Sequence, residues 1–182
     1  SYLMLFPMCG ITKSMAKRQS TDKQGKLKIG DNWNAITIIA LSQSNPLKAI
    51  AEFVENSIDA RASQITIIRG RQGGQTYLKI IDNGEGIDDF KYVATHIGDS
   101  IKRKLKNEGV SGLQGEFGIG LLSFWTVGEE LVMSSCGSEG VTRRMKLVKN
   151  NPGYSISEVG NLFDRSGTEL LIMPILAGVK QL

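Results

Sequence analysis

Apolar and polar positions between residues 46 and 60 (PLKAIAEFVENSIDA) alternate with the period of an amphipathic helix. Drawn at about 100° per residue, the two kinds of side chain fall on opposite arcs. The apolar arc holds Leu47, Ile50, Val54 and Ile58, and the polar arc holds Glu52, Glu55, Asn56 and Asp59. Taken alone, the polar arc is either a solvated face or a carboxylate and an amide held one turn apart to contact a ligand. We expect the apolar arc to pack this helix onto the rest of the fold.

Several runs rich in β-branched and apolar residues predict strands. Residues 64–70 (QITIIRG) and 75–81 (QTYLKII) are separated by a glycine-containing turn, which predicts a hairpin. The other candidate strands are residues 130–136, 142–148, 167–174 and a shorter one over 154–160. Further helices are predicted over 31–44, 88–98 and 117–128, whereas the charged stretch 99–114 lacks periodicity and is predicted to be a loop.

The order of these elements indicates the fold class. Strands joined by short turns, with helices before and between them, predict an α+β fold in which helices cover one face of a mixed, mostly antiparallel sheet. Regular alternation of strand and helix is missing, so a doubly wound nucleotide fold is not expected. A length of 182 residues suits one domain with a real core, with or without a tail.

Charge is distributed unevenly along the chain. Residues 1–30 carry six basic side chains and one acidic one, whereas the remaining 16 basic and 17 acidic residues nearly cancel. We therefore expect a basic N-terminal arm over 1–30 and one nearly neutral domain over 31–182. The arm is either a solvated tail or a segment that touches nucleic acid.

Two cysteines, Cys9 and Cys136, suit a reducing compartment and predict neither a disulfide scaffold nor a zinc site. The apolar start of the chain is too short to span a bilayer. We expect a cytoplasmic protein without a membrane-spanning segment.

Familiar catalytic signatures are missing from the sequence. It contains no GxxxxGK[ST] phosphate loop and no GxGxxG after a strand, and His96 is its only histidine. Two other clusters stand out. Asp82 to Gly86 (DNGEG) follows a strand, where Asp82 either accepts a hydrogen bond from the exocyclic amine of a base or satisfies N–H groups of its own turn. Gly115 to Leu121 (GEFGIGL) opens an apolar helix, which either exposes N–H groups to phosphate or packs closely on a neighbour.

Taken together and in this order, the segments resemble the GHKL ATPase superfamily. This superfamily includes gyrase B subunits, heat-shock chaperones of the ninety-kilodalton class, sensor histidine kinases and mismatch-repair ATPases of the MutL type. The resemblance covers residues 31–175 and rests on E-x-x-x-N-x-x-D-A at 52–60, D-x-G-x-G at 82–86, G-x-F-G-x-G-[FL] at 115–121 and G-T at 167–168. It implies a two-layer α/β sandwich of the Bergerat type.

The resemblance also implies a role for each matching residue. Asn56 would bind Mg²⁺, Glu52 would act as the general base toward water, and Asp82 would bind the adenine amino group. The remaining implied contacts to Mg·ATP are Asp59 in support, Gly84 and Gly86 at the base, Gly115, Gly118, Ile119, Gly120 and Leu121 at the phosphates, and Thr168 beside the base. Residues 99–114 correspond to the ATP lid. Its basic residues, Lys102 among them, either neutralise phosphate or are solvated, and Lys102 has no assigned role.

Within the superfamily, Glu52 and the glycine motif favour the chaperone and mismatch-repair branch. Histidine kinases generally lack a carboxylate four residues before the metal-binding asparagine. We therefore expect slow ATP hydrolysis that drives lid closure, conformational change or dimerisation in a larger protein with a downstream transducer domain. The alternatives are a histidine-kinase-type phosphotransfer domain and a nucleotide-gated interaction module that does not hydrolyse ATP. Nucleic acid or a client protein remains open as the partner.

Overall fold

A computed structural model of the chain describes residues 23–26, 45–95 and 117–179. Residues 90–95 are also helical. The named elements are β1 (Lys23–Lys26), α2 (Pro46–Asp59), β2 (Ile65–Gln72), β3 (Gln75–Asp82), α4 (Phe117–Leu122), the 3₁₀ helix η1 (Ser123–Thr126), β4 (Glu130–Cys136), β5 (Thr142–Val148), β6 (Gly153–Glu158), β7 (Gly167–Ile172) and the 3₁₀ helix η2 (Ala177–Val179).

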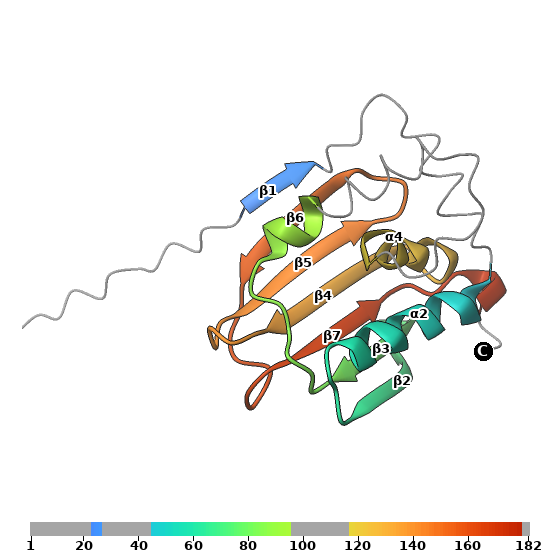
Figure 1. Cartoon of the computed structure of the whole chain (residues 1–182). Helices are drawn as coiled ribbons and strands as arrows, with labels where there is room; N and C mark the ends of the chain where they lie inside the picture. The colour runs from blue at the N-terminus through green and yellow to red at the C-terminus, as the bar shows by residue number, and fades with distance from the viewer. Residues whose placement is uncertain (1–22, 27–44, 96–116, 180–182) are drawn as a thin grey trace, which may run out of the picture.

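The strands form one sheet in the order β1-β6-β5-β4-β7-β3-β2, and all six pairings are antiparallel. In Figure 1, α2, α4 and the helical residues 90–95 lie over one face of this sheet. The predicted α+β two-layer sandwich is confirmed. The sheet, expected to be mixed, is antiparallel throughout the part of the chain that the structure describes.

The hydrophobic core lies between the two layers. Its largest fully buried side chains include Trp125, Phe53, Phe90 and Phe124 from the helices. Alternate residues of each strand face this core, because successive side chains of a strand point to opposite sides of the sheet. On β3 this alternation buries Leu78 and Ile80 and places Asp82 on the same side, at the end of the strand.

The hairpin predicted from residues 64–81 is confirmed. β2 and β3 pair from Ile65 opposite Asp82 to Gln72 opposite Gln75. Only Gly73 and Gly74 remain in the turn, with φ of +56° and +81°. Two-residue hairpin turns favour such positive φ values because their twist matches that of the strands.

The helix predicted over residues 46–60 is confirmed as α2, but the predicted buried face is partly wrong. The side chain of Asn45 caps the helix by accepting a hydrogen bond from the Leu47 N–H at 2.9 Å. The fully buried row is Ala49, Phe53 and Ser57, whereas Leu47 and Ile58 are 57% and 60% exposed. Ser57 is the polar member of this row, which a hydrophobicity pattern does not include, and its hydroxyl bonds to the Phe53 carbonyl oxygen and to Asp82.

Strand β1 lies within the segment predicted as a basic arm. Its four residues pair with β6, from Lys23 opposite Ile156 to Lys26 opposite Gly153. The rest of the arm, the helix predicted over 31–44 and the loop predicted over 99–114 lie outside the described residues. Among the helices that are described, the structure contains none long and apolar enough to cross a membrane.

Candidate functional site

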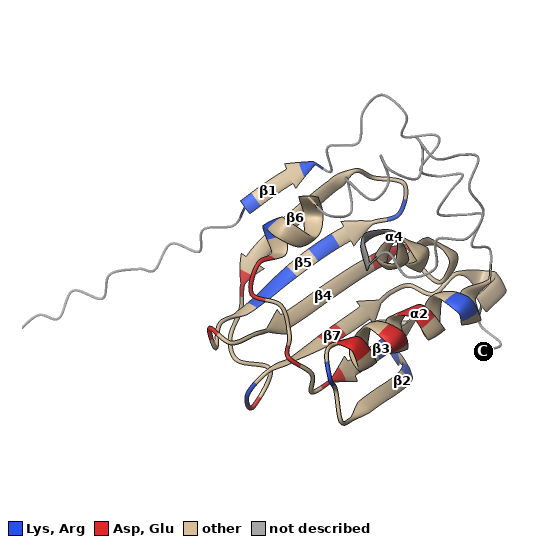
Figure 2. Cartoon of the chain, viewed as in Figure 1, with Lys and Arg blue, Asp and Glu red and all other residues tan. Residues whose placement is uncertain are grey.

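A cavity of about 260 Å³ is lined by residues of α2, α4, β3, β4 and β7 and of the loop after β3. Its apolar wall consists of Phe53, Ile87, Leu121, Met133 and Leu170, and its polar lining includes Asn56, Ser57, Asp59, Asp82, Glu85 and Thr168. Every charged residue among these is acidic. Figure 2 shows further acidic residues along α2, beside this region. The site is therefore a small apolar pocket with a negatively charged rim.

Asp82 lies within the cavity lining and is only 7% exposed. The Ser57 hydroxyl donates to its Oδ2 at 2.7 Å, and the Gly84 N–H donates to its Oδ1 at 2.9 Å. These two bonds fix the orientation of the carboxylate. A carboxylate offers about four acceptor sites in all, so the group retains acceptor capacity for a ligand.

Thr168 lies directly opposite Asp82 in the β3–β7 register. Its hydroxyl is 2.8 Å from that of Ser135, a completely buried residue of β4. Ser135 Oγ also lies 2.9 Å from the Gly167 carbonyl oxygen and accepts a hydrogen bond from the Ile87 N–H at 2.9 Å. The predicted proximity of Asp82 and Thr168 thus arises from strand pairing, and Ser135 links β4 and β7 to the loop after β3.

Glu52 and Asn56 lie one turn apart on α2, on the side of the helix next to α4. Asn56 lines the cavity. A Cβ added at Gly120 would lie 2.9 Å from Glu52 Oε2, so this carboxylate approaches the backbone of α4 closely. Asp59 is exposed and lies at the rim of the cavity. The structure therefore brings together two motifs that are more than sixty residues apart.

The two glycines of the DNGEG segment are each required for a different structural reason. A Cβ added at Gly84 would lie 2.7 Å from the Ala60 carbonyl oxygen. Gly86 has a φ of +70°, and a Cβ there would overlap the carbonyl oxygen of Cys136. This loop therefore approaches both the end of α2 and the end of β4 more closely than other residues allow.

We expect Gly86→Ala to destabilise the fold more than Gly74→Ala does. Both substitutions place an alanine at positive φ, which costs about 1–2 kcal/mol. Gly74 has open space around its Cα, so its variant reports the backbone cost alone. Gly86→Ala must also displace backbone from Cys136. Urea unfolding measures both losses, and equal losses would contradict the close approach inferred for Gly86.

The glycine motif of residues 115–121 is described only from Phe117 onward. Gly115 lies outside the described residues, and Gly118 and Ile119 belong to the backbone of α4. Leu121 is 6% exposed and contributes to the apolar wall of the cavity. Binding of phosphate by this segment stays a prediction.

Three serines of the site were not predicted from the sequence. Ser57 and Ser135 orient Asp82 and Thr168, and the Ser166 hydroxyl donates to the Gly84 carbonyl oxygen at 2.7 Å. A partial signal exists for Ser135, because it shares strand parity with the core residues Leu131 and Met133. Ser57 follows Phe53 by four positions and so lies on the same helix face.

Comparison with known proteins identifies the family. The family described as "Histidine kinase-, DNA gyrase B-, and HSP90-like ATPase" matches residues 44–154, more than half of the chain. "DNA mismatch repair protein MutL" of Thermosipho melanesiensis is 30% identical over 151 residues, which cover 77% of this chain and 26% of that protein. The protein of the same name from Lactiplantibacillus plantarum is 29% identical over 115 residues, 59% of this chain and 16% of the relative.

A shorter match reaches higher identity. The Clostridium botulinum protein of that name is 57% identical over 42 residues, 23% of this chain and 6% of the relative. The chain spans about a quarter or less of the length of these relatives. The predicted resemblance, including its mismatch-repair side, is confirmed. The chain belongs to the histidine kinase-, DNA gyrase B- and HSP90-like ATPase family, the GHKL superfamily.

Proposed function

We propose that this chain binds Mg·ATP in the cavity beside α2 and hydrolyses it slowly, as the nucleotide-binding part of a larger protein. The observation that carries the proposal is the fixed, buried carboxylate of Asp82 within an apolar cavity, beside the Thr168 hydroxyl. Family membership supports the same activity.

Recognition of the adenine base would rest on Asp82. An exocyclic amine donates hydrogen bonds, and Asp82 is an acceptor whose other contacts are already satisfied by Ser57 and Gly84. The apolar wall would exclude water from the faces of the base. Such a site discriminates strongly against ligands without the amine, because they would leave a buried carboxylate without its hydrogen-bond partner.

Asn56 would hold Mg²⁺ through its amide oxygen, a ligand type that this hard cation prefers. The described residues contain no group of three or more histidine, cysteine or acidic side chains arranged to hold a metal ion by themselves. A single amide oxygen from Asn56 suits Mg²⁺, because this cation keeps several waters and takes further ligands from phosphates. The acidic rim would disfavour a bare polyphosphate. When bound, the cation supplies charge neutralisation that the described cavity lining lacks.

Glu52 would act as the general base. Its carboxylate accepts a proton from the attacking water as the water oxygen bonds to the γ-phosphorus. The bond between that phosphorus and the bridging oxygen then breaks, and ADP leaves with the bonding electrons. Phosphoryl transfer depends mainly on positioning and electrostatics, so one well-placed carboxylate suffices for this role.

In the larger protein, nucleotide binding would drive closure of the ATP lid, which residues 99–114 would form. A conformational change or dimerisation would follow. The mismatch-repair relatives support a role in DNA repair, with a downstream transducer domain as the first partner within the protein. Nucleic acid and a client protein are the two candidate external partners. Binding of nucleic acid or of a client protein is best tested with the full-length protein.

ATP labelled at the γ-phosphate distinguishes hydrolysis from phosphotransfer. We expect the full-length protein with Mg²⁺ to release labelled phosphate, at a rate that falls when the cation is chelated. Label retained on a protein histidine would instead establish the kinase alternative. Binding of ADP in calorimetry without any turnover of ATP would establish a nucleotide-gated interaction module.

A further inference from the structure

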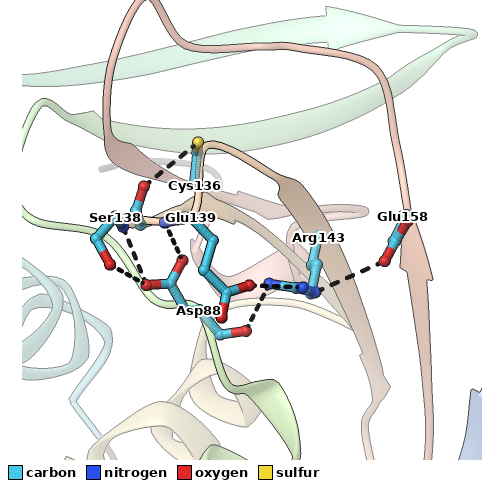
Figure 3. Close-up of polar contacts among 7 residues, drawn as sticks. Asp88, Cys136, Ser138, Glu139, Arg143 and Glu158 are labelled. Carbon is cyan, nitrogen blue, oxygen red and sulfur yellow. Dashed lines mark hydrogen bonds and ion pairs between the residues drawn. The ribbon is translucent and has the colours of Figure 1, made fainter.

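The loop after β3 is attached to the β4–β5 turn, which follows it by about fifty residues. The Asp88 carboxylate accepts three hydrogen bonds from this turn: from the Ser138 N–H at 3.0 Å, the Ser138 hydroxyl at 2.8 Å and the Glu139 N–H at 3.2 Å. Figure 3 shows these donors converging on one carboxylate. The cavity residues Gly86 and Ile87 immediately precede Asp88.

Arg143 strengthens this attachment from β5. Its Nη1 donates to the backbone carbonyl oxygen of Asp88 at 2.8 Å, and its Nη2 lies 2.9 Å from Glu139 Oε2. The guanidinium also lies 4.0 Å from a carboxylate oxygen of Glu158 on β6. Asp88, Ser138, Glu139 and Arg143 are called the Asp88 clasp below. The clasp thus joins the loop to the β4–β5 turn and to strand β5.

Glycine makes the close approach possible on the side of the turn. A Cβ added at Gly137 would overlap the Asp88 carboxylate, as one at Gly86 would overlap the Cys136 carbonyl oxygen. Two glycines from different segments therefore meet at one contact. This pairing indicates that the loop is seated tightly on the turn.

The ionised form of Asp88 is the one that the clasp stabilises. Burial raises the pKa of this carboxyl, but hydrogen bonds from the Ser138 hydroxyl and from the Glu139 and Ser138 N–H groups, together with the Arg143 charge, outweigh burial. The net result is a pKa below the ordinary value of 3.8. Hydrogen bonds to an ionised acceptor are stronger than neutral ones.

The first half of the loop has separate attachments. The Asn83 side-chain oxygen accepts from the Ser63 and Gln64 N–H groups at 3.0 and 2.9 Å, and the Glu85 N–H donates to the Ala60 carbonyl oxygen at 2.8 Å. Loss of the clasp would therefore loosen residues 86–88 without releasing residues 83–85. Ile87 would lose the support of its neighbour Asp88 at the wall of the cavity and would keep its N–H bond to the Ser135 hydroxyl.

We propose that Asp88 is a positioning residue for nucleotide recognition, which holds Gly86 and Ile87 in place through the Asp88 clasp. The inference rests on the proposed binding of adenine nucleotide in the cavity. Asp88 itself does not line the cavity, so it acts through its neighbours. Loss of Asp88 should weaken the binding of ligands that contain adenine and should loosen residues 86–88 locally.

The test measures ADP affinity by calorimetry and backbone hydrogen exchange in the same variants of the 182-residue chain. We expect Asp88→Ala to raise the dissociation constant for ADP roughly tenfold, because several hydrogen bonds to a charged group are lost. Exchange of the Ile87 amide should accelerate, whereas amides of β6 should keep their wild-type protection. Asp164→Asn removes the same charge from an exposed position and should change neither quantity.

A milder pair of variants keeps the test valid if Asp88→Ala does not fold. Ser138 is exposed, so Ser138→Thr keeps the hydroxyl while its extra methyl lies in solvent. Ser138→Ala should weaken ADP binding about threefold, consistent with one hydrogen bond of modest net value, and Ser138→Thr should restore it.

The outcomes separate the clasp from the proposed function. Wild-type ADP affinity and wild-type exchange at Ile87 in both Asp88→Ala and Ser138→Ala would overturn the positioning role of Asp88 and leave the proposed function intact. Acceleration of exchange across the whole sheet, in step with lost stability, would also overturn it. A wild-type chain that binds no ADP would overturn the proposed function and the clasp together.

Discussion

Asp82→Asn is expected to raise the dissociation constant for ADP by roughly 10- to 100-fold, the cost of a lost hydrogen bond to a charged group. Asparagine preserves the shape of the side chain, and its oxygen can still accept from Ser57 or Gly84. It replaces the second carboxylate oxygen by an amide nitrogen, which donates instead of accepting. Two donors, the amide and the exocyclic amine of adenine, would then face each other.

Calorimetry with ADP measures the loss, and thermal unfolding without ligand shows whether the fold survives. Asp164→Asn again serves as the control, because it removes one negative charge from an exposed position. An Asp82→Asn variant with wild-type affinity would remove Asp82 from adenine recognition. The binding of ADP at some other site would then have to be sought.

Glu52→Ala is expected to leave ATP binding nearly unchanged while turnover by the full-length protein falls at least about 100-fold. General bases contribute about 10²- to 10⁴-fold to rates, and their removal affects the reacting state more than the bound ground state. The Glu52 side chain approaches Gly120 rather than the Asp82 end of the cavity. The contacts with the adenine ring should therefore persist. Phosphate release under saturating ATP measures the effect.

Glu55→Ala is the matched control for this second experiment. Glu55 lies on the same helix, is exposed and does not line the cavity. Its replacement by alanine therefore removes the same charge from α2 without changing the cavity lining. Turnover by Glu52→Ala equal to that of Glu55→Ala would refute the general-base assignment. Loss of ATP binding in Glu52→Ala would instead assign Glu52 to substrate binding.

Local patterns predicted much of the fold. The β2–β3 hairpin, the bounds of α2 and the strands after residue 130 follow from periodicity and turn residues, which act within a few positions. Strand β1 could not be predicted in this way, because KQGK has no strand signature and pairs with β6, about 130 residues away. Its strand conformation depends on that partner.

The sequence motifs pointed to several residues that the structure places in the cavity lining, but not to the contacts that support them. Asp82 and Thr168 stand out because glycines and strand ends mark them. Ser57 and Ser135 carry no motif signature of their own, and their importance comes from the carboxylate and hydroxyl that the fold places beside them. The same limit explains the wrong assignment of Ile58 to the buried face of α2.

The place of β7 in the sheet determines when the site can exist during synthesis of the chain. Because β7 lies between β3 and β4, the β2–β3 hairpin and the β4–β5–β6 segment share no paired strand until residues 167–172 have left the ribosome. Asp82 and Ser135 belong to different halves until that moment. Contacts between distant segments form slowly, because a long loop must close first. A nascent chain therefore completes the lining of the cavity only after β7 has inserted between β3 and β4.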